Sequence, residues 1–73
     1  MDAEECTELV SRLFALMTSK FEDAAGEAAD GQGKGRDDSE QIARAERIEL
    51  VARDISLMAE ATAAVLRRNC VES

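Results

Sequence analysis

Two pairs of glutamates are the residues of this sequence best suited to chemistry. Glu5 and Glu8 form one pair, and Glu46 and Glu49 form the other. Carboxylates three residues apart share one face of a helix, where they can bind the Mg²⁺ used to hydrolyse nucleoside triphosphates. The expected packing puts both pairs on outer faces near opposite ends of a helical hairpin. We interpret them as solvated charges and keep a carboxylate- and magnesium-dependent all-α nucleotide hydrolase fragment as an alternative.

Other reactive side chains are sparse. The sequence has no histidine, and its two cysteines, Cys6 and Cys70, are too far apart for a metal-binding spacing. A serine or cysteine nucleophile would lack a histidine base. We therefore predict no catalytic residue, no metal site and no cofactor, and expect that the protein is not an enzyme.

The glycine-rich segment 31–36, Gly-Gln-Gly-Lys-Gly-Arg, resembles a phosphate-binding loop only in composition. A P-loop requires four residues between glycine and Gly-Lys-Ser/Thr, and it follows a strand. Neither condition is met here, so we interpret the segment as a flexible connector.

Composition limits the possible partners. The chain has 73 residues and a net charge of −7, which disfavours nucleic acid and anionic membranes. Arginines on the second helix leave an RNA- or DNA-associated small helical regulator as an alternative, but acidic residues alternate with them. The four-residue spacing of Glu40 with Arg44 and of Glu49 with Arg53 predicts salt bridges along this helix. The acidic N-terminus and the lack of a long apolar run predict a cytoplasmic protein without a membrane span.

The hydrophobic pattern predicts one all-α domain over residues 1–73. We expect a first helix over about 3–29, a connector over about 30–37 and a second helix over about 38–69. Asp2 with Glu5 forms a capping box at the first helix. The second helix has two candidate boxes, one from residues 37 and 40 and one from residues 38 and 41.

A short connector forces the two helices into an antiparallel hairpin. Facing residues should then have numbers that add to about 70, which places Phe14 and Phe21 against the apolar stripe of the second helix. Thr62 lies on that stripe and could donate its hydroxyl to the carbonyl of Met58.

A second apolar row lies beside this seam, and we predict that it is a partner interface. So small a hairpin buries little by itself, and pairing the row with another chain would bury several large side chains. We expect a homodimer that forms a four-helix bundle, with another helical protein as the alternative partner. The predicted function is a small acidic protein–protein interaction module or regulatory adaptor. The interface residues are Leu9, Leu16, Leu50, Leu57, Ala61 and Ala64.

The cysteines lie at the same end of the predicted hairpin. Cys6 belongs to the inward stripe, whereas an α-helical phase extended to Cys70 points that side chain away from the first helix. We therefore expect a buried, unreactive Cys6 thiol, an exposed, reactive Cys70 and no intramolecular disulfide.

Overall fold

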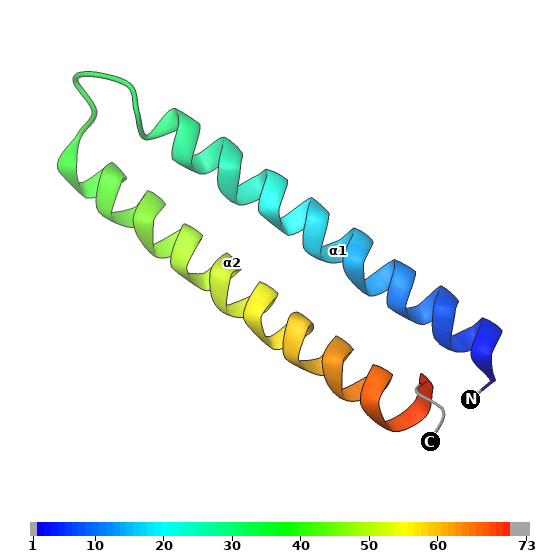
Figure 1. Ribbon diagram of the computed structural model, residues 1–73. Helices are drawn as coiled ribbons and strands as arrows, with labels where there is room; N and C mark the ends of the chain where they lie inside the picture. Colours follow the sequence, from blue (N-terminus) through cyan, green and yellow to red (C-terminus); the bar gives the residue numbers. More distant parts are fainter. Residues whose placement is uncertain (1, 71–73) are drawn as a thin grey trace.

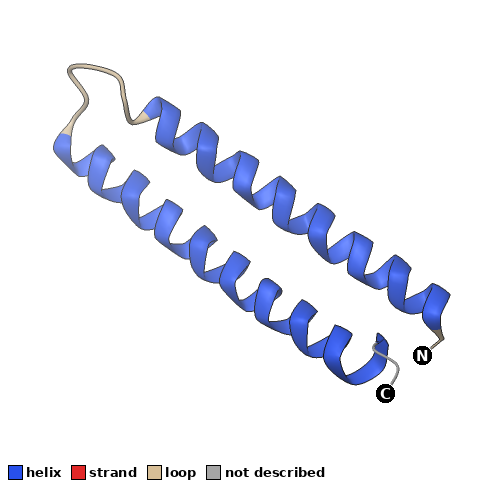
Figure 2. Ribbon diagram, in the orientation of Figure 1, coloured by secondary structure: helices blue, strands red, loops and turns tan. Residues whose placement is uncertain are grey.

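The computed structural model describes residues 2–70 of the chain, and side chains as far as Arg68. Helix α1 (Ala3–Asp30) and helix α2 (Asp38–Val65) lie side by side and antiparallel, and a short π-helix, η1 (Leu66–Cys70), continues α2. The connector closes one end of this rod, and the start of α1 and the end of η1 lie at the other (Figure 1). Figure 2 shows that the described residues contain helix and loop but no strand. The predicted all-α hairpin is therefore confirmed.

Local capping explains where both helices begin. Asp2 accepts a hydrogen bond of 2.8 Å from the backbone of Glu5, as the sequence predicts. At α2 the cap is Asp37, which accepts from the backbone of Glu40, so the cap comes from the first of the two candidate pairs. Satisfying these N–H groups stabilises the first turn of each helix.

The connector is tied to α2 by side-chain hydrogen bonds. Gln41 donates to the carbonyl of Gly31 at 2.8 Å and accepts from the guanidinium of Arg44. Gly35 has a φ of 73°, a left-handed conformation that favours glycine. These contacts turn the chain tightly enough for α2 to run back along α1.

The seam between the helices follows a heptad pattern. In α1 and α2 the residues with the least exposure recur at intervals of three and four, which is the spacing of an antiparallel coiled coil. On α1 these seam residues are Cys6, Val10, Leu13, Met17, Lys20, Ala24 and Glu27, and on α2 they are Gln41, Arg44, Ile48, Val51, Ile55, Met58, Thr62 and Val65.

Contacts across the seam fix the register. They join Lys20 to Asp54, Glu27 to Arg44 and Arg47, and Gly31 to Gln41, so the paired numbers add to between 71 and 74. The helices are therefore displaced by a few residues from the predicted register, whose facing numbers add to about 70.

The predicted positions of the two phenylalanines are wrong. Phe14 is 54% exposed and Phe21 is 58% exposed, whereas both were expected against the stripe of α2. Leu13 and Lys20, one position earlier, occupy the seam instead. One step along a helix turns the side chain by about 100°, so each phenylalanine lies on a flank.

The interior of the hairpin is very small. Among the residues whose burial is described, Cys6, Met17 and Thr62 are the fully buried ones. The Thr62 hydroxyl donates to the carbonyl of Met58 at 2.7 Å, which confirms the predicted bond. Neither long helix has the combined length and hydropathy of a membrane span in residues 2–70.

The prediction for the cysteines needs correction. Cys6 is buried, with 2% exposure, but it is disulfide-bonded. Its expected state as an unreactive thiol is therefore wrong. The prediction for Cys70 concerns a side chain outside the described residues. The α-helical phase used for that prediction also ends at Val65, because the following five residues form a π-helix with more residues per turn.

Candidate interaction surfaces

The heptad pattern divides the hairpin into two sides. Each heptad has two seam positions, and the second follows the first by three residues. Because the helices run in opposite directions, the residues directly after the second position lie on one side of the seam in both helices. Residues that directly precede the first seam position lie on the other side. Each side thus combines one row from α1 with one row from α2.

Of the six residues predicted as a partner interface, Leu9, Leu16 and Ala61 directly precede a first seam position and lie on one side, which we call the leucine side. Leu50, Leu57 and Ala64 lie one row farther from the seam on the same flank of α2, and we count them with this side. Leu16 is 54% exposed, Leu50 58% and Leu57 64%, while Leu9 is half-buried. Ala61 and Ala64 are exposed on α2. All six residues therefore lie on the same flank of the hairpin, with Arg47 and Asp54 between the seam and the leucines of α2.

The other side was not recognised from the sequence, because the phenylalanines were assigned to the seam. We call it the phenylalanine side, and all of its residues are exposed except Leu66, which is half-buried. It consists of Thr7, Phe14, Phe21 and Ala28 on α1, Ala45, Ala52 and Ala59 on α2, and Leu66 in η1. None of these eight side chains is charged. The signal that could have revealed it is the alanine that recurs every seven residues from Ala45 to Ala59.

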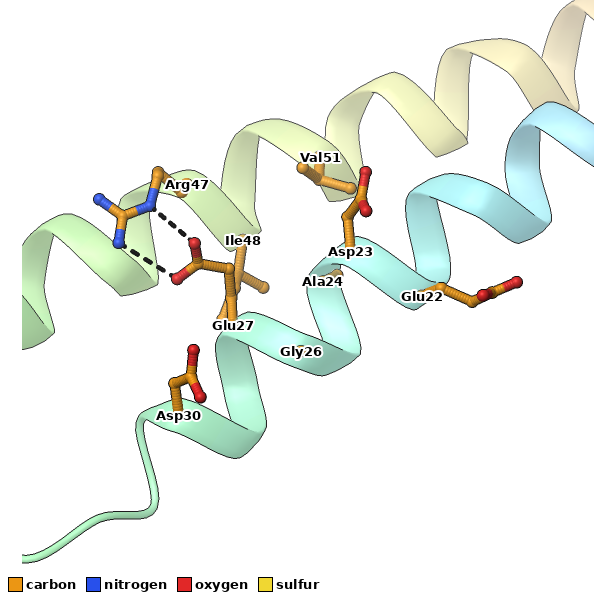
Figure 3. A pocket seen from close by; sticks show the side chains of 9 residues that line it. All are labelled: Glu22, Asp23, Ala24, Gly26, Glu27, Asp30, Arg47, Ile48 and Val51. Carbon is orange, nitrogen blue, oxygen red and sulfur yellow. Dashed lines mark hydrogen bonds and ion pairs between the residues drawn. The ribbon is translucent and has the colours of Figure 1, made fainter.

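A depression of about 450 Å³ lies toward the connector (Figure 3). Four carboxylates and one guanidinium line it, over an apolar floor that includes Ile48 and Val51. Figure 3 shows Glu27 turned toward Arg47, while Glu22 points away from the depression. The leucine side is therefore bordered by charges at its connector end.

Glu27 is the electrostatic centre of this depression. Hydrogen bonds from Arg47 lower the pKa of the Glu27 carboxyl, and the nearby charge of Arg44 lowers it further. The same pairing raises the pKa of Arg47. Arg44 Nε is buried without a hydrogen bond, although it lies 3.4 Å from Glu27 and so retains an ionic contact. The cluster is thus held in its charged form across neutral pH.

The glutamate pairs considered for magnesium are exposed and belong to different ends of the rod. Glu49 pairs with Arg53, the four-residue helix bridge that the sequence predicts. Within residues 2–70 no group of three or more acidic or cysteine side chains is placed to hold a metal ion. Arg44 pairs across the seam with Glu27, whereas the sequence suggested Glu40 as its partner.

Comparison with known proteins yields no relative from which a function could be transferred. No protein-family model matches the chain, and no curated protein or solved structure is significantly similar to it.

Proposed function

We propose that the protein is a small acidic interaction module that self-associates through an apolar side of its helical hairpin. The observation that carries this proposal is the exposure of six large apolar side chains, each more than half accessible, on a chain with three fully buried residues in its described part. These six are Phe14, Leu16, Phe21, Ile42, Leu50 and Leu57.

Association would supply the apolar burial that the hairpin lacks. Fully burying a leucine or phenylalanine side chain contributes about 1.5–3 kcal/mol, before the entropy cost of association is subtracted. Two hairpins that share an apolar side give a four-helix bundle, a common arrangement for helices with more than one apolar flank. The proposed product of this chain is therefore a binding surface.

The leucine side is a proposed partner interface, for a second copy or for another helical protein. Its exposed leucines lie one heptad apart on α2, the spacing at which a partner helix makes repeated contacts. The alternating charges at its connector end would restrict which partner fits there.

Sedimentation equilibrium of the purified chain at micromolar concentrations tests self-association. We expect the mass of a dimer, and a monomer at all concentrations would contradict the proposal. Changing both Leu50 and Leu57 to Glu then asks whether the leucine side holds the second copy. Loss of dimer with unchanged helical circular dichroism would assign it that role, whereas an unchanged dimer would leave the leucine side to another protein.

A further inference from the structure

The accessible surface area of the chain indicates how large an interface a partner could cover. A compact folded protein of 7.9 kDa exposes about 4,400 Å² by the scaling of area with mass. This hairpin exposes 5600 Å², about 1,200 Å² more. A standard stable interface covers about 800 Å² on each partner. The excess is therefore large enough for one complete dimer interface.

The phenylalanine side has matched large and small residues at the same level along the rod. In the register of the seam contacts, Phe14 lies level with Ala59 and Phe21 lies level with Ala52, because each pair of numbers adds to 73. Ala28 and Ala45 form the next level toward the connector. Each phenylalanine on α1 thus has a small side chain beside it on α2.

Two hydroxyl groups on and beside this side are already satisfied. Thr7 donates its hydroxyl to the carbonyl of Ala3 at 2.9 Å, and Thr18 donates to the carbonyl of Phe14 at 3.0 Å. Both threonines can therefore be covered without leaving a buried donor unpaired. On the outer edge of α2, Ile42 adds a further apolar side chain that is 60% exposed.

We infer that a second copy of this chain packs on the phenylalanine side, with the connectors of the two hairpins at the same end. The inference rests on the proposed self-association and specifies its face and its symmetry. The twofold axis runs along the rod, so that α1 of each chain lies on α2 of the other. Phe14 then packs over Ala59 of the second copy, and Phe21 packs over Ala52.

The alternative twofold axis, across the rod, fits these side chains less well. It would place α1 on α1 and α2 on α2, so that phenylalanines would meet one another at one edge and alanines would meet at the other. Helices separated by two phenylalanines lie farther apart than helices separated by alanines, which would wedge the interface open. The large-on-small pairing therefore selects the axis along the rod and leaves the leucine side facing outward.

Two charge variants, measured by sedimentation, locate the dimer face. Changing both Phe14 and Phe21 to Glu should raise the dimer dissociation constant at least about 100-fold, because two buried aromatic side chains are replaced by charges. The comparison variant, Leu50 and Leu57 both changed to Glu, tests the competing face, and a dissociation constant within about threefold of the original value would place the second copy on the phenylalanine side. Circular dichroism of each variant checks that the hairpin remains helical.

A size exchange tests the pairing without introducing charge. Phe21→Ala leaves a gap over Ala52 of the second copy. Ala52→Phe crowds a second aromatic ring against Phe21 of the second copy, so each change alone should weaken the dimer. The two changes together restore one large and one small residue at that level, and dimer affinity should recover. A double variant as weak as the worse single variant would overturn the pairing.

Cross-linking tests the symmetry. Lys20 and Lys34 are the lysines of the chain, and Lys34 lies in the connector. A short amine-reactive reagent applied to a mixture of ¹⁴N- and ¹⁵N-labelled chains should give mixed-isotope Lys34–Lys34 peptides. The opposite arrangement would separate the connectors by most of the 56 Å length of the rod and give none.

The failure of this inference can be distinguished from the failure of the proposed function. A wild-type chain that stays monomeric contradicts self-association itself. A dimer that survives the phenylalanine variant and dissociates in the leucine variant overturns the inference but preserves self-association. Dissociation in the phenylalanine variant alone, together with Lys34–Lys34 cross-links, supports it.

Discussion

The guanidinium of Arg47 holds the carboxylate of Glu27 through two hydrogen bonds, each 3.1 Å long. This paired geometry joins α1 to α2 near the connector, where the seam otherwise contains alanine and long polar side chains. A bidentate pair is the geometry in which a surface ion pair contributes most, although solvent still screens it. The connector end of the rod therefore depends on charge where the other end depends on apolar packing.

The lowered pKa of Glu27 predicts weaker folding in acid. A carboxyl whose pKa falls on folding stabilises the protein above its unfolded pKa, and that stabilisation is lost as the pH falls through the folded pKa. We expect Glu27→Gln to lower the urea midpoint at neutral pH, and the difference from wild type to shrink as the pH falls below the ordinary carboxyl range. Urea unfolding followed by circular dichroism at each pH measures this.

The control for that prediction is Arg47→Gln. In this background Glu27 retains only Arg44 nearby, so Glu27→Gln should cost less stability than it does in the wild-type chain. An equal cost in both backgrounds would show that the pair contributes nothing measurable.

A second prediction concerns Thr62, which is 2% exposed on the seam. Its hydroxyl bonds within its own helix to Met58, and such a bond adds little to stability. Thr62→Val should therefore leave the melting temperature unchanged or raise it slightly. Thr62→Ser keeps the hydroxyl and removes the buried methyl group, so it should cost about 1 kcal/mol. A fall of several degrees for the valine variant would reveal a contribution of the hydroxyl beyond this bond.

The sequence predicted the features that depend on neighbouring residues. The Asp2 cap, a cap at residue 37 or 38, the long helices and the Thr62 hydroxyl bond follow from local chemistry and the helical period, and the structure decides for Asp37. The assignment of Phe14 and Phe21 failed because both flanks of each helix carry apolar residues. The period alone then leaves open which of two adjacent positions enters the seam, and the cross-seam contacts decide it.

The two candidate interfaces also differ in how far the sequence alone reveals them. The leucines of the leucine side were recognisable because two of them recur one heptad apart on α2. The phenylalanine side required the register, since its large residues lie on α1 and its small ones on α2. The sequence shows each row separately but cannot show that they lie level across the seam.

A third prediction concerns two glycines, whose replacement by alanine should change folding stability in opposite directions. Gly26 lies inside α1, and a methyl group built there meets no atom within 4 Å. Gly26→Ala should therefore stabilise the hairpin by about 1 kcal/mol through helix propensity. Gly35→Ala should destabilise it by about 1 kcal/mol, because alanine is strained at a φ of 73°. Thermal unfolding of both variants measures the two effects, and equal signs would contradict the conformation of one of these sites.

The last prediction concerns the disulfide at Cys6. The bond lies at the end of the rod opposite the connector, and Cys70 is the only other cysteine of the chain. A cross-link that closes a loop of about 60 residues restricts the unfolded chain and stabilises the folded one by about 4 kcal/mol, or less if the native bond is strained. Reduction should therefore lower the urea midpoint markedly. Cys6→Ser should lower it by a similar amount in the absence of reductant.

The control is the response of the Cys6→Ser variant to reductant, which should be negligible because the bond is already lost. Peptide mapping of the unreduced wild-type protein should recover the two cysteine-containing peptides joined to each other. Thiol labelling in denaturant gives the independent readout. We expect fewer than one reactive thiol per chain before reduction and two after it, and two before reduction would show that the bond does not form in solution.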